Sequence, residues 1–160
     1  MKTKRILCIV TSADRIGPKN LPTGYYFPEV AHAHLVFAAD GHEVEFASIK
    51  GGEPPMEGYD GTDLANVIFR ESAAFGRLNN SHRLGDLDIS EFDGVYFPGG
   101  HGPMVDLFRE EVVKEAIRTS DANGRVIGAV CHGPAALLGV TMSNGGTFLS
   151  GRRIAAFTRE

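Results

Sequence analysis

Cys131 is the residue of this 160-residue sequence whose setting best fits covalent chemistry. It follows the apolar residues 126–130 and precedes His132-Gly133-Pro134 and the helix-forming residues 135–138. This pattern predicts a buried strand, a sharp turn that carries the thiol, and a helix. A helix N-terminus offers free backbone N–H groups and the positive end of a dipole, which favour the thiolate. We therefore expect Cys131 to be a nucleophile at neutral pH; the alternative is a small buried hydrophobe.

Two other residues are candidates for proton transfer. His132 directly follows the cysteine, and a histidine paired with a nucleophilic cysteine orients or activates the sulfur. Glu29 follows Pro28 at the predicted start of a helix. A glutamate in a first helical turn often only complements the helix dipole, whereas beside a nucleophile it serves as a general acid and base. The residues alone leave both roles of Glu29 open.

A glycine-rich turn follows another predicted strand, residues 94–97, and continues as Gly100-His101-Gly102. Glycines here allow backbone N–H groups to approach a substrate. We expect an N–H near Gly100 and the N–H of His132 to stabilise an oxyanion on a carbon bonded to the Cys131 sulfur. His101 lies in the turn and is expected to line the pocket or to be solvated. The alternative is that the glycines only form a turn.

No metal site is expected. His32 and His34 are two residues apart and do not share a helix face, and Glu29 with His32 gives too few ligands. Cys8 lies in an apolar run and is expected in the core. Two cysteines in such different settings give no disulfide framework and no zinc spacing, which is typical of a reducing compartment.

The elements that position these residues alternate along the chain. Apolar runs predict strands at 6–10, 44–47, 94–97 and 126–130, and helices are expected at 28–39 and 62–74, with a loop at 51–55 and a polar connector around residues 79–80. A further helix is predicted by Val105, Phe108, Val112 and Ala116 at helical spacing. This alternation predicts an α/β fold with a mostly parallel sheet and helices on both faces. Ligands bind such sheets at the carboxyl ends of strands, where Cys131 and the glycine turn lie.

Length and charge limit the possible functions. With 160 residues, 42% of them hydrophobic, we expect one domain over residues 1–160. The net charge of −4, without a lysine or arginine cluster, argues against nucleic-acid binding. Residues 6–10 are too short an apolar run for a signal sequence or a membrane span, so we expect no membrane partner and a cytoplasmic protein.

Three segments carry a resemblance to a known family: AVCHGPAALL, FPGGHGPMVDL and TGYYFPEVAHAHLVFAADGHEVEFAS. Through them the chain resembles the DJ-1/PfpI superfamily, in particular its Hsp31-like branch of glutathione-independent glyoxalases (glyoxalase III, D-lactate dehydratase), deglycases and holding chaperones. The resemblance runs from about Lys4 to Thr158. It implies a flavodoxin-like three-layer sandwich, Glu29 beside the nucleophile as general acid and base, no cofactor, and a homodimer.

The resemblance also implies a third site residue, a carboxylate that orients His132. In the Hsp31-like branch it follows a strand similar to residues 154–158, and Glu160 is the candidate that this chain offers. Members of the branch continue for several tens of residues, so we expect the C-terminal part usual in the family to be lacking. The alternative is therefore that the true partner of His132 is missing.

The predicted function is conversion of methylglyoxal or glyoxal, a small dicarbonyl, to lactate or glycolate. Cys131 forms a hemithioacetal, and Glu29 moves a proton between the adjacent carbons through an enediol. One alternative is a PfpI-like peptidase or amidotransferase-like hydrolase, although the amidotransferase needs a late histidine and none follows His132. Another is a redox-sensing holding chaperone with an oxidisable Cys131 and an exposed apolar surface.

Overall fold

The computed structural model describes residues 2–157 and contains a central sheet of five parallel strands in the order β7-β5-β1-β8-β9. The strands are β1 (Arg5–Val10), β5 (Glu43–Ser48), β7 (His82–Arg83), β8 (Gly94–Phe97) and β9 (Val126–Ala129). Two further pairs lie beside the sheet: β2 (Arg15–Ile16) with β3 (Leu21–Pro22), and β4 (Tyr25–Tyr26) with β6 (Met56–Glu57). The predicted mostly parallel sheet is confirmed.

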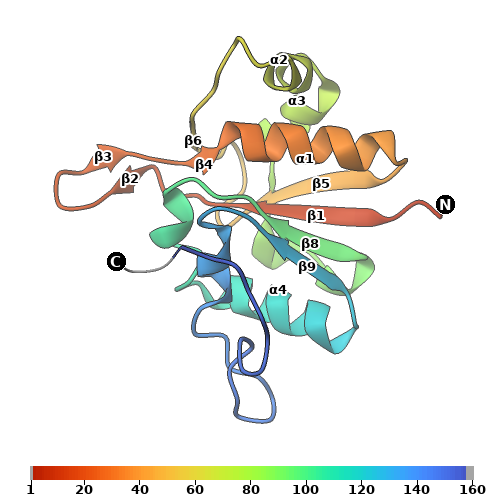
Figure 1. Ribbon diagram of the computed structural model, residues 1–160, viewed down its shortest axis with the longest axis vertical. Coiled ribbons are helices and arrows are strands. Elements are labelled where there is room, and N and C mark those ends of the chain that lie inside the picture. Colours follow the sequence, from red (N-terminus) through yellow and green to blue (C-terminus); the bar gives the residue numbers. More distant parts are fainter. Residues whose placement is uncertain (1, 158–160) are drawn as a thin grey trace.

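Helices cover both faces of the sheet (Figure 1). One side carries α1 (Phe27–Ala39), α2 (Leu64–Arg70) and α3 (Ala73–Asn79), and the other carries α4 (Glu111–Ala122). Short 3₁₀ helices connect the larger elements: η1 (Leu84–Asp86), η2 (Ile89–Glu91), η3 (Gly102–Met104) and η4 (Gly133–Leu137). This is the predicted flavodoxin-like three-layer arrangement.

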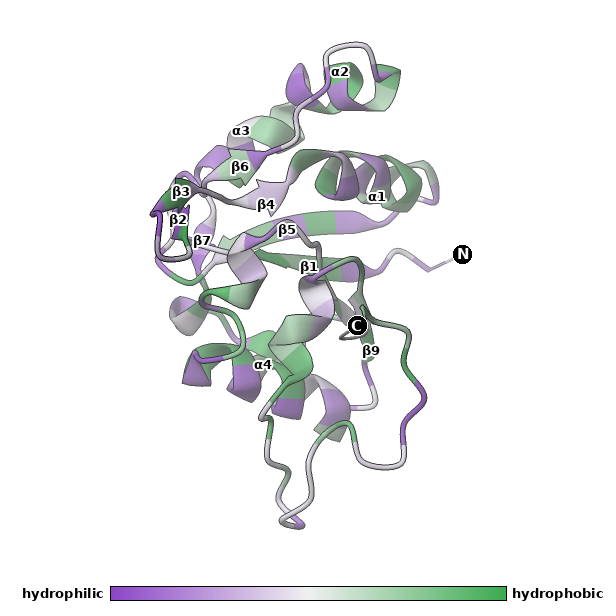
Figure 2. Cartoon of the chain, turned by 60° about the vertical axis from the view of Figure 1, so that its left-hand side comes forward, coloured by the Kyte–Doolittle hydropathy of each residue, from purple (hydrophilic) through white to green (hydrophobic). Residues whose placement is uncertain are grey.

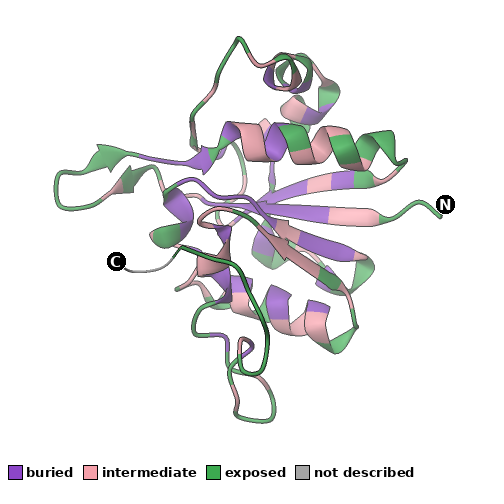
Figure 3. Cartoon of the chain, viewed as in Figure 1, coloured by how far each residue is buried: buried purple, intermediate pink, exposed green. Residues whose placement is uncertain are grey.

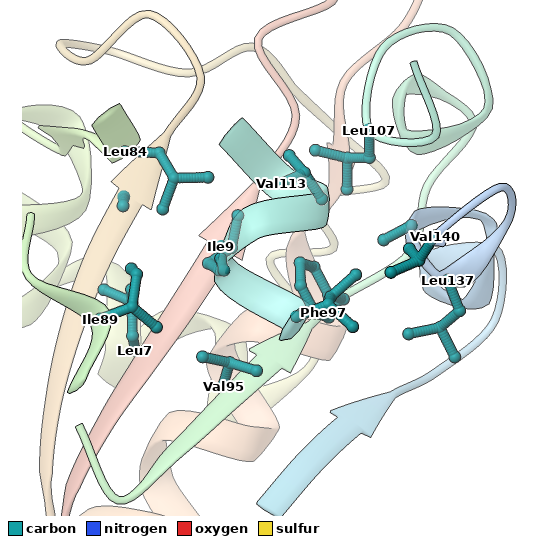
Figure 4. Packing of buried hydrophobic residues seen from close by; sticks show 14 of the residues in the cluster. Leu7, Ile9, Leu84, Ile89, Val95, Phe97, Leu107, Val113, Leu137 and Val140 are labelled. Atoms are coloured by element: carbon teal, nitrogen blue, oxygen red, sulfur yellow. The ribbon is translucent and has the colours of Figure 1, made fainter. Parts of the chain in front are cut away.

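The central strand β1 contributes to a separate core on each face of the sheet. Leu7 and Ile9 pack into the cluster on the α4 side (Figure 4), whereas Cys8 and Val10 pack into the cluster under α1. Successive side chains of a strand point to opposite faces, so a strand buried on both faces is apolar throughout. The purple middle of the sheet in Figure 3 shows this burial. The prediction that Cys8 lies in the core is confirmed.

The predicted helix through Val105 and Phe108 is wrong, because α4 begins only at Glu111. The preceding residues form η3 and turns. The carboxylate of Asp106 accepts hydrogen bonds from Thr11 Oγ1 and from the Ser12 N–H, both at 2.8 Å. These bonds tie the segment to the end of β1 and fix it outside the helix. Within α4 the apolar side faces the sheet, and Figure 2 shows the alternation of hydrophobic and hydrophilic residues.

The single helix predicted for residues 62–74 is also wrong, since α2 ends at Arg70 and α3 begins at Ala73. Ser72 has an extended backbone (ψ 158°), and its hydroxyl donates to Phe69 O at 2.6 Å. A serine that binds nearby backbone in this way competes with helix continuation. The expected connector at residues 79–80 is instead the end of α3 and its C-cap.

The chain after β8 is less regular than predicted. Strand β9 ends at Ala129, and the segment after Cys131 forms the five-residue 3₁₀ helix η4 rather than an α-helix. No strand forms at residues 154–157, and Thr158 and Glu160 lie outside the described residues. Within residues 2–157, every helix is too short or too polar to cross a membrane.

Candidate active site

Cys131 lies on a sharp turn at the carboxyl end of the sheet. Its φ of 57° is in the left-handed region, which residues other than glycine rarely adopt. The turn is closed by two backbone bonds: Val130 N donates to Phe97 O at 3.1 Å, and Gly133 N donates to Val130 O at 2.7 Å. A Cβ at Gly133 would lie 2.1 Å from Phe97 O, so only glycine lets the turn pack against the end of β8.

Glu29 lies beside this turn, in the first turn of α1. Its Oε2 accepts a hydrogen bond from the Gly99 N–H at 2.6 Å, and its backbone carbonyl accepts one from the Tyr96 hydroxyl at 3.1 Å. A Cβ at Gly99 would lie 2.6 Å from Cys131 Cβ and 2.8 Å from Glu29 Oε2. The missing side chain at position 99 therefore lets the carboxylate and the thiol-bearing residue approach each other.

The backbone N–H groups of Gly100 and His132 lie near the Cys131 sulfur and act to lower the pKa of its thiol. Gly100 has φ +91°, a conformation that suits glycine. These are the two donors expected for an oxyanion, and the structure brings them to one place; their catalytic role stays a prediction. Gly102 holds the glycine turn in place instead: it is buried, and its N–H donates to Gly24 O at 3.2 Å.

The electrostatics at the sulfur differ from the expectation of a thiolate. Burial raises the pKa of the Cys131 thiol, and the negative charge of Glu29 raises it further, while the N–H groups of Gly100 and His132 oppose this. The expected α-helix dipole is not there, because η4 is a single short 3₁₀ turn. The sulfur therefore holds its proton at neutral pH, and an attack by the sulfur requires a proton acceptor.

His132 is such an acceptor. Its Nδ1 lies 3.4 Å from Cys131 Sγ. Burial and the nearby His101 lower the pKa of His132, so the neutral imidazole prevails at neutral pH. Its ring stacks on Phe157, with the ring centroids 4.6 Å apart. Among residues 2–157 no carboxylate hydrogen-bonds this ring, and the predicted partner Glu160 lies outside that range.

His101 lies next to His132, with ring centroids 5.1 Å apart. Its partner is Glu57, a residue that the sequence did not reveal: Glu57 Oε1 lies 2.7 Å from the His101 backbone N and 2.9 Å from its Nδ1. Glu57 belongs to the two-residue strand β6, which is too short to leave a periodic signal. Asp106 was missed for a similar reason, since its partners Thr11 and Ser12 are distant in sequence.

Two cavities adjoin the site. A cavity of about 200 Å³ opens over the sulfur and the His132 ring, with mostly apolar walls that include Met104, Leu138, Leu149, Ile154 and Phe157. A second cavity of about 450 Å³ lies on the other side of Glu29, between α1 and the segment that leads into α2. Cys131 thus faces a small apolar space.

The histidines of α1 do not form a metal centre. His32 Nε2 pairs with Asp63 Oδ2 at 2.7 Å, whereas the His34 ring packs against Phe69 with the ring centroids 5.0 Å apart. In the described part of the chain, no cluster of three or more His, Cys, Asp or Glu side chains is arranged to bind a metal.

Comparison with known proteins gives a consistent result. The DJ-1/PfpI family model matches residues 25–156. A glutathione-independent glyoxalase of Saccharomyces cerevisiae is 27% identical over 99% of this chain and 70% of its own length. The crystal structure of glyoxalase III from Candida albicans superposes with a TM-score of 0.81 at 26% identity, covering 97% of this chain and 68% of that one.

A protein/nucleic acid deglycase of Escherichia coli is 38% identical over 74% of this chain, but the match covers only 44% of its own length. A Schizosaccharomyces pombe glyoxalase is likewise matched over 63% of its length. The chain therefore spans between about two fifths and 70% of these curated relatives.

Proposed function

Because this chain belongs to the DJ-1/PfpI family, we propose that it is a glutathione-independent glyoxalase that converts methylglyoxal to lactate and glyoxal to glycolate. The names of its relatives support a glyoxalase activity. The observation that carries the proposal is that the Glu29 carboxylate and the Cys131 side chain both lie against the space left by the missing side chain of Gly99. A thiol next to a carboxylate is the pair that a hemithioacetal route requires.

In the first step, Cys131 Sγ adds to the aldehyde carbon of the substrate. The carbon–sulfur bond forms, the π electrons move to the carbonyl oxygen, and the thiol proton passes to His132 Nδ1. The N–H groups of Gly100 and His132 stabilise the negative oxygen, which then takes the proton back from His132. The product is a hemithioacetal, and no atom has been gained or lost beyond the two reactants.

In the second step, the Glu29 carboxylate removes the hydrogen from the carbon that carries sulfur, and the electron pair moves to the neighbouring carbonyl oxygen, giving an enediolate. The hydroxyl proton of the sulfur-bearing carbon passes to that oxygen, and the proton held by Glu29 is returned to the adjacent carbon, which produces a thioester with a hydroxyl group beside it. Water hydrolyses the thioester and restores the thiol. Because one carbon is oxidised while its neighbour is reduced, the conversion needs no external electron acceptor.

The cavity over the sulfur supports a small substrate. Its volume of about 200 Å³ and its apolar walls suit the methyl group of methylglyoxal. His132 lines this cavity together with Cys131, whereas Glu29 lines the second cavity and is linked to the site through its hydrogen bond with the Gly99 N–H.

The test is an assay of the purified protein with methylglyoxal in the absence of glutathione, with lactate as the measured product. We expect lactate formation by the wild type and none above background by Cys131→Ser. Cys8→Ala is the matched control, because Cys8 is buried in the core and takes no part in the site. A folded wild type that forms neither lactate nor glycolate refutes the proposal.

A second candidate, a holding chaperone, is favoured by one observation. Several large apolar side chains are solvent-exposed, among them Val36, Leu64, Val126, Leu138, Ile154 and Phe157. Exposed apolar surface binds unfolded clients. The two functions are compatible, but only the glyoxalase reaction requires the Cys131 sulfur.

A further inference from the structure

Glu57 and His101 form a doubly hydrogen-bonded pair at the edge of the candidate active site. A single oxygen, Glu57 Oε1, lies 2.7 Å from the His101 backbone N and 2.9 Å from its Nδ1. An ionised carboxylate only accepts hydrogen bonds, so His101 Nδ1 must carry the hydrogen. The side chain of Glu57 is 24% exposed and that of His101 is 58% exposed, so only the carboxylate end of the pair is partly shielded from water.

The Glu57–His101 pair is connected to the candidate nucleophile through His132. The His101 ring lies against the His132 ring, with centroids 5.1 Å apart and planes inclined by 35°. His132 Nδ1 in turn lies 3.4 Å from Cys131 Sγ. A contiguous path thus leads from the Glu57 carboxylate through two imidazoles to the sulfur.

The fold holds both members of the pair. Pairing of β4 with β6 sets Glu57 opposite Tyr26. The Tyr26 N–H donates to Gly99 O at 3.0 Å, which attaches the turn before His101 to the same strand. Glu57 and His101 are therefore anchored through one short backbone segment, unlike an ion pair between two free surface side chains.

We propose that Glu57 is a positioning residue of the candidate active site: it fixes His101 in the Nδ1–H tautomer and thereby holds the His132 ring with its Nδ1 toward the Cys131 sulfur. Among residues 2–157 this is the carboxylate that reaches the histidines of the site through a hydrogen bond. Within the described range of the chain, the charged and titratable groups around His132 are Cys131, Glu29, His101 and Glu57. Burial and His101 lower the pKa of His132, whereas Glu29 and Glu57 raise it, in line with the contact between these side chains.

Two measurements test the proposal. The first is ¹⁵N NMR of the histidine side chains, which reports the tautomer of His101 whether or not the protein is an enzyme. The second is kcat and KM for methylglyoxal, and this part rests on the proposed function. The variants are Glu57→Ala, Glu57→Gln and the control Glu53→Gln, which removes an exposed carboxylate four residues earlier in the chain.

We expect the wild type and Glu53→Gln to show the Nδ1–H tautomer of His101 and equal kcat. Glu57→Ala loses that tautomer, and its kcat falls roughly tenfold to a hundredfold with little change in KM, the usual scale for removing a group that orients a histidine. Glu57→Gln retains an accepting oxygen, so it keeps the tautomer and most of kcat, which also covers the case in which the alanine variant does not fold.

Three results overturn the proposal: an Nε2–H tautomer in the wild type, a Glu57→Ala protein that keeps both tautomer and kcat, or a change in only one of the two. A loss in Glu57→Gln as large as in Glu57→Ala also contradicts it, since charge rather than hydrogen bonding would then matter. If the wild type consumes no dicarbonyl, the proposed function fails while the tautomer result still decides the structural role of Glu57.

Discussion

Glu29 acts on the sulfur of Cys131 in two opposing ways. Its negative charge raises the pKa of the thiol and so keeps the nucleophile protonated. The same carboxylate is the group placed to move the carbon-bound proton in the proposed reaction. A neutral amide at this position removes both effects at once, and the two are measured separately.

Glu29→Gln is therefore expected to shift two rates in opposite directions. Turnover of methylglyoxal falls at least about a hundredfold, because the general base is lost. Alkylation of Cys131 by iodoacetamide at pH 7 becomes faster, because removal of the negative charge lowers the pKa of the thiol and increases the thiolate fraction. Peptide mapping after limited labelling and a lactate assay provide the two readouts.

Cys8 serves as an internal control in this experiment, since burial raises the pKa of its thiol strongly and no reagent reaches it in the folded protein. Wild-type turnover in Glu29→Gln would return Glu29 to the role of complementing the helix dipole. Slower labelling of Cys131 in Glu29→Gln would show that the Glu29 carboxylate does not hold the proton on the sulfur.

At the scale of single residues, the sequence indicated the site residues that belong to continuous motifs. Cys131, His132 and Gly100 could be predicted because each lies within three residues of the end of a strand. The state of the sulfur could not, since its pKa depends on burial and on Glu29, about a hundred residues earlier. Glu57 was missed because its role arises only from the fold.

At the level of elements, the turn between β9 and η4 depends on close backbone packing. The end of β8 contributes Phe97 O, which accepts from Val130 N and leaves no room for a side chain at position 133. The site is thus formed by two adjacent strand ends, and its geometry depends on their pairing, Phe97 opposite Ala129.

Gly133→Ala is expected to destabilise the protein by about 1–3 kcal/mol, because the added methyl group overlaps a backbone oxygen that cannot move away. Gly76→Ala is the matched control. That glycine lies in α3 with no atom within 4 Å of the added carbon, so alanine there is expected to stabilise by about 0.5–1 kcal/mol. Urea unfolding of both variants gives the comparison, and equal stabilities would contradict the packing argument.

Apolar periodicity located the strands near residues 6–10, 44–47, 94–97 and 126–130 but located several helices poorly. The prediction that the strand before Cys131 is buried is wrong, because β9 lies at the edge of the sheet and Val126 is 73% exposed. The residues of β8 and α1 were recognised almost to their ends, because apolar runs and Pro28 mark them. The break at Ser72 and the late start of α4 depend instead on side-chain hydrogen bonds, from Ser72 to Phe69 O and from Thr11 and Ser12 to Asp106. Such tertiary contacts leave no periodic signal.

At the scale of the whole molecule, the buried apolar core and the exposed apolar side chains lie in different regions. The central strands of the sheet lie between two apolar cores, while the edge strands β7 and β9 are partly or fully exposed and the segment after η4 is largely exposed in Figure 3. Phe157, which stacks on His132, is itself 70% exposed. The cavity over the Cys131 sulfur and the exposed apolar side chains are thus adjacent, but the proposed reaction requires the sulfur and client binding does not.

Cys131→Ser separates the two candidate functions. Dicarbonyl consumption requires the sulfur and is expected to vanish, whereas suppression of client aggregation depends on exposed apolar surface and is expected to stay nearly unchanged. Light scattering of a heat-denatured client, run beside the lactate assay, provides the comparison. A wild type that holds clients and consumes no dicarbonyl would leave the chaperone as the better description.

At Cys131 the left-handed backbone lowers the stability of the fold, whereas the proposed reaction requires the side chain that causes this cost. Glycine would adopt φ 57° without the steric cost that a β-carbon adds, about 1–2 kcal/mol. Selection for a more durable fold alone would therefore drive this position toward glycine, and every such replacement would remove the sulfur. The steric cost at Cys131 therefore does not stabilise the fold, which supports the proposed role of its sulfur as a nucleophile.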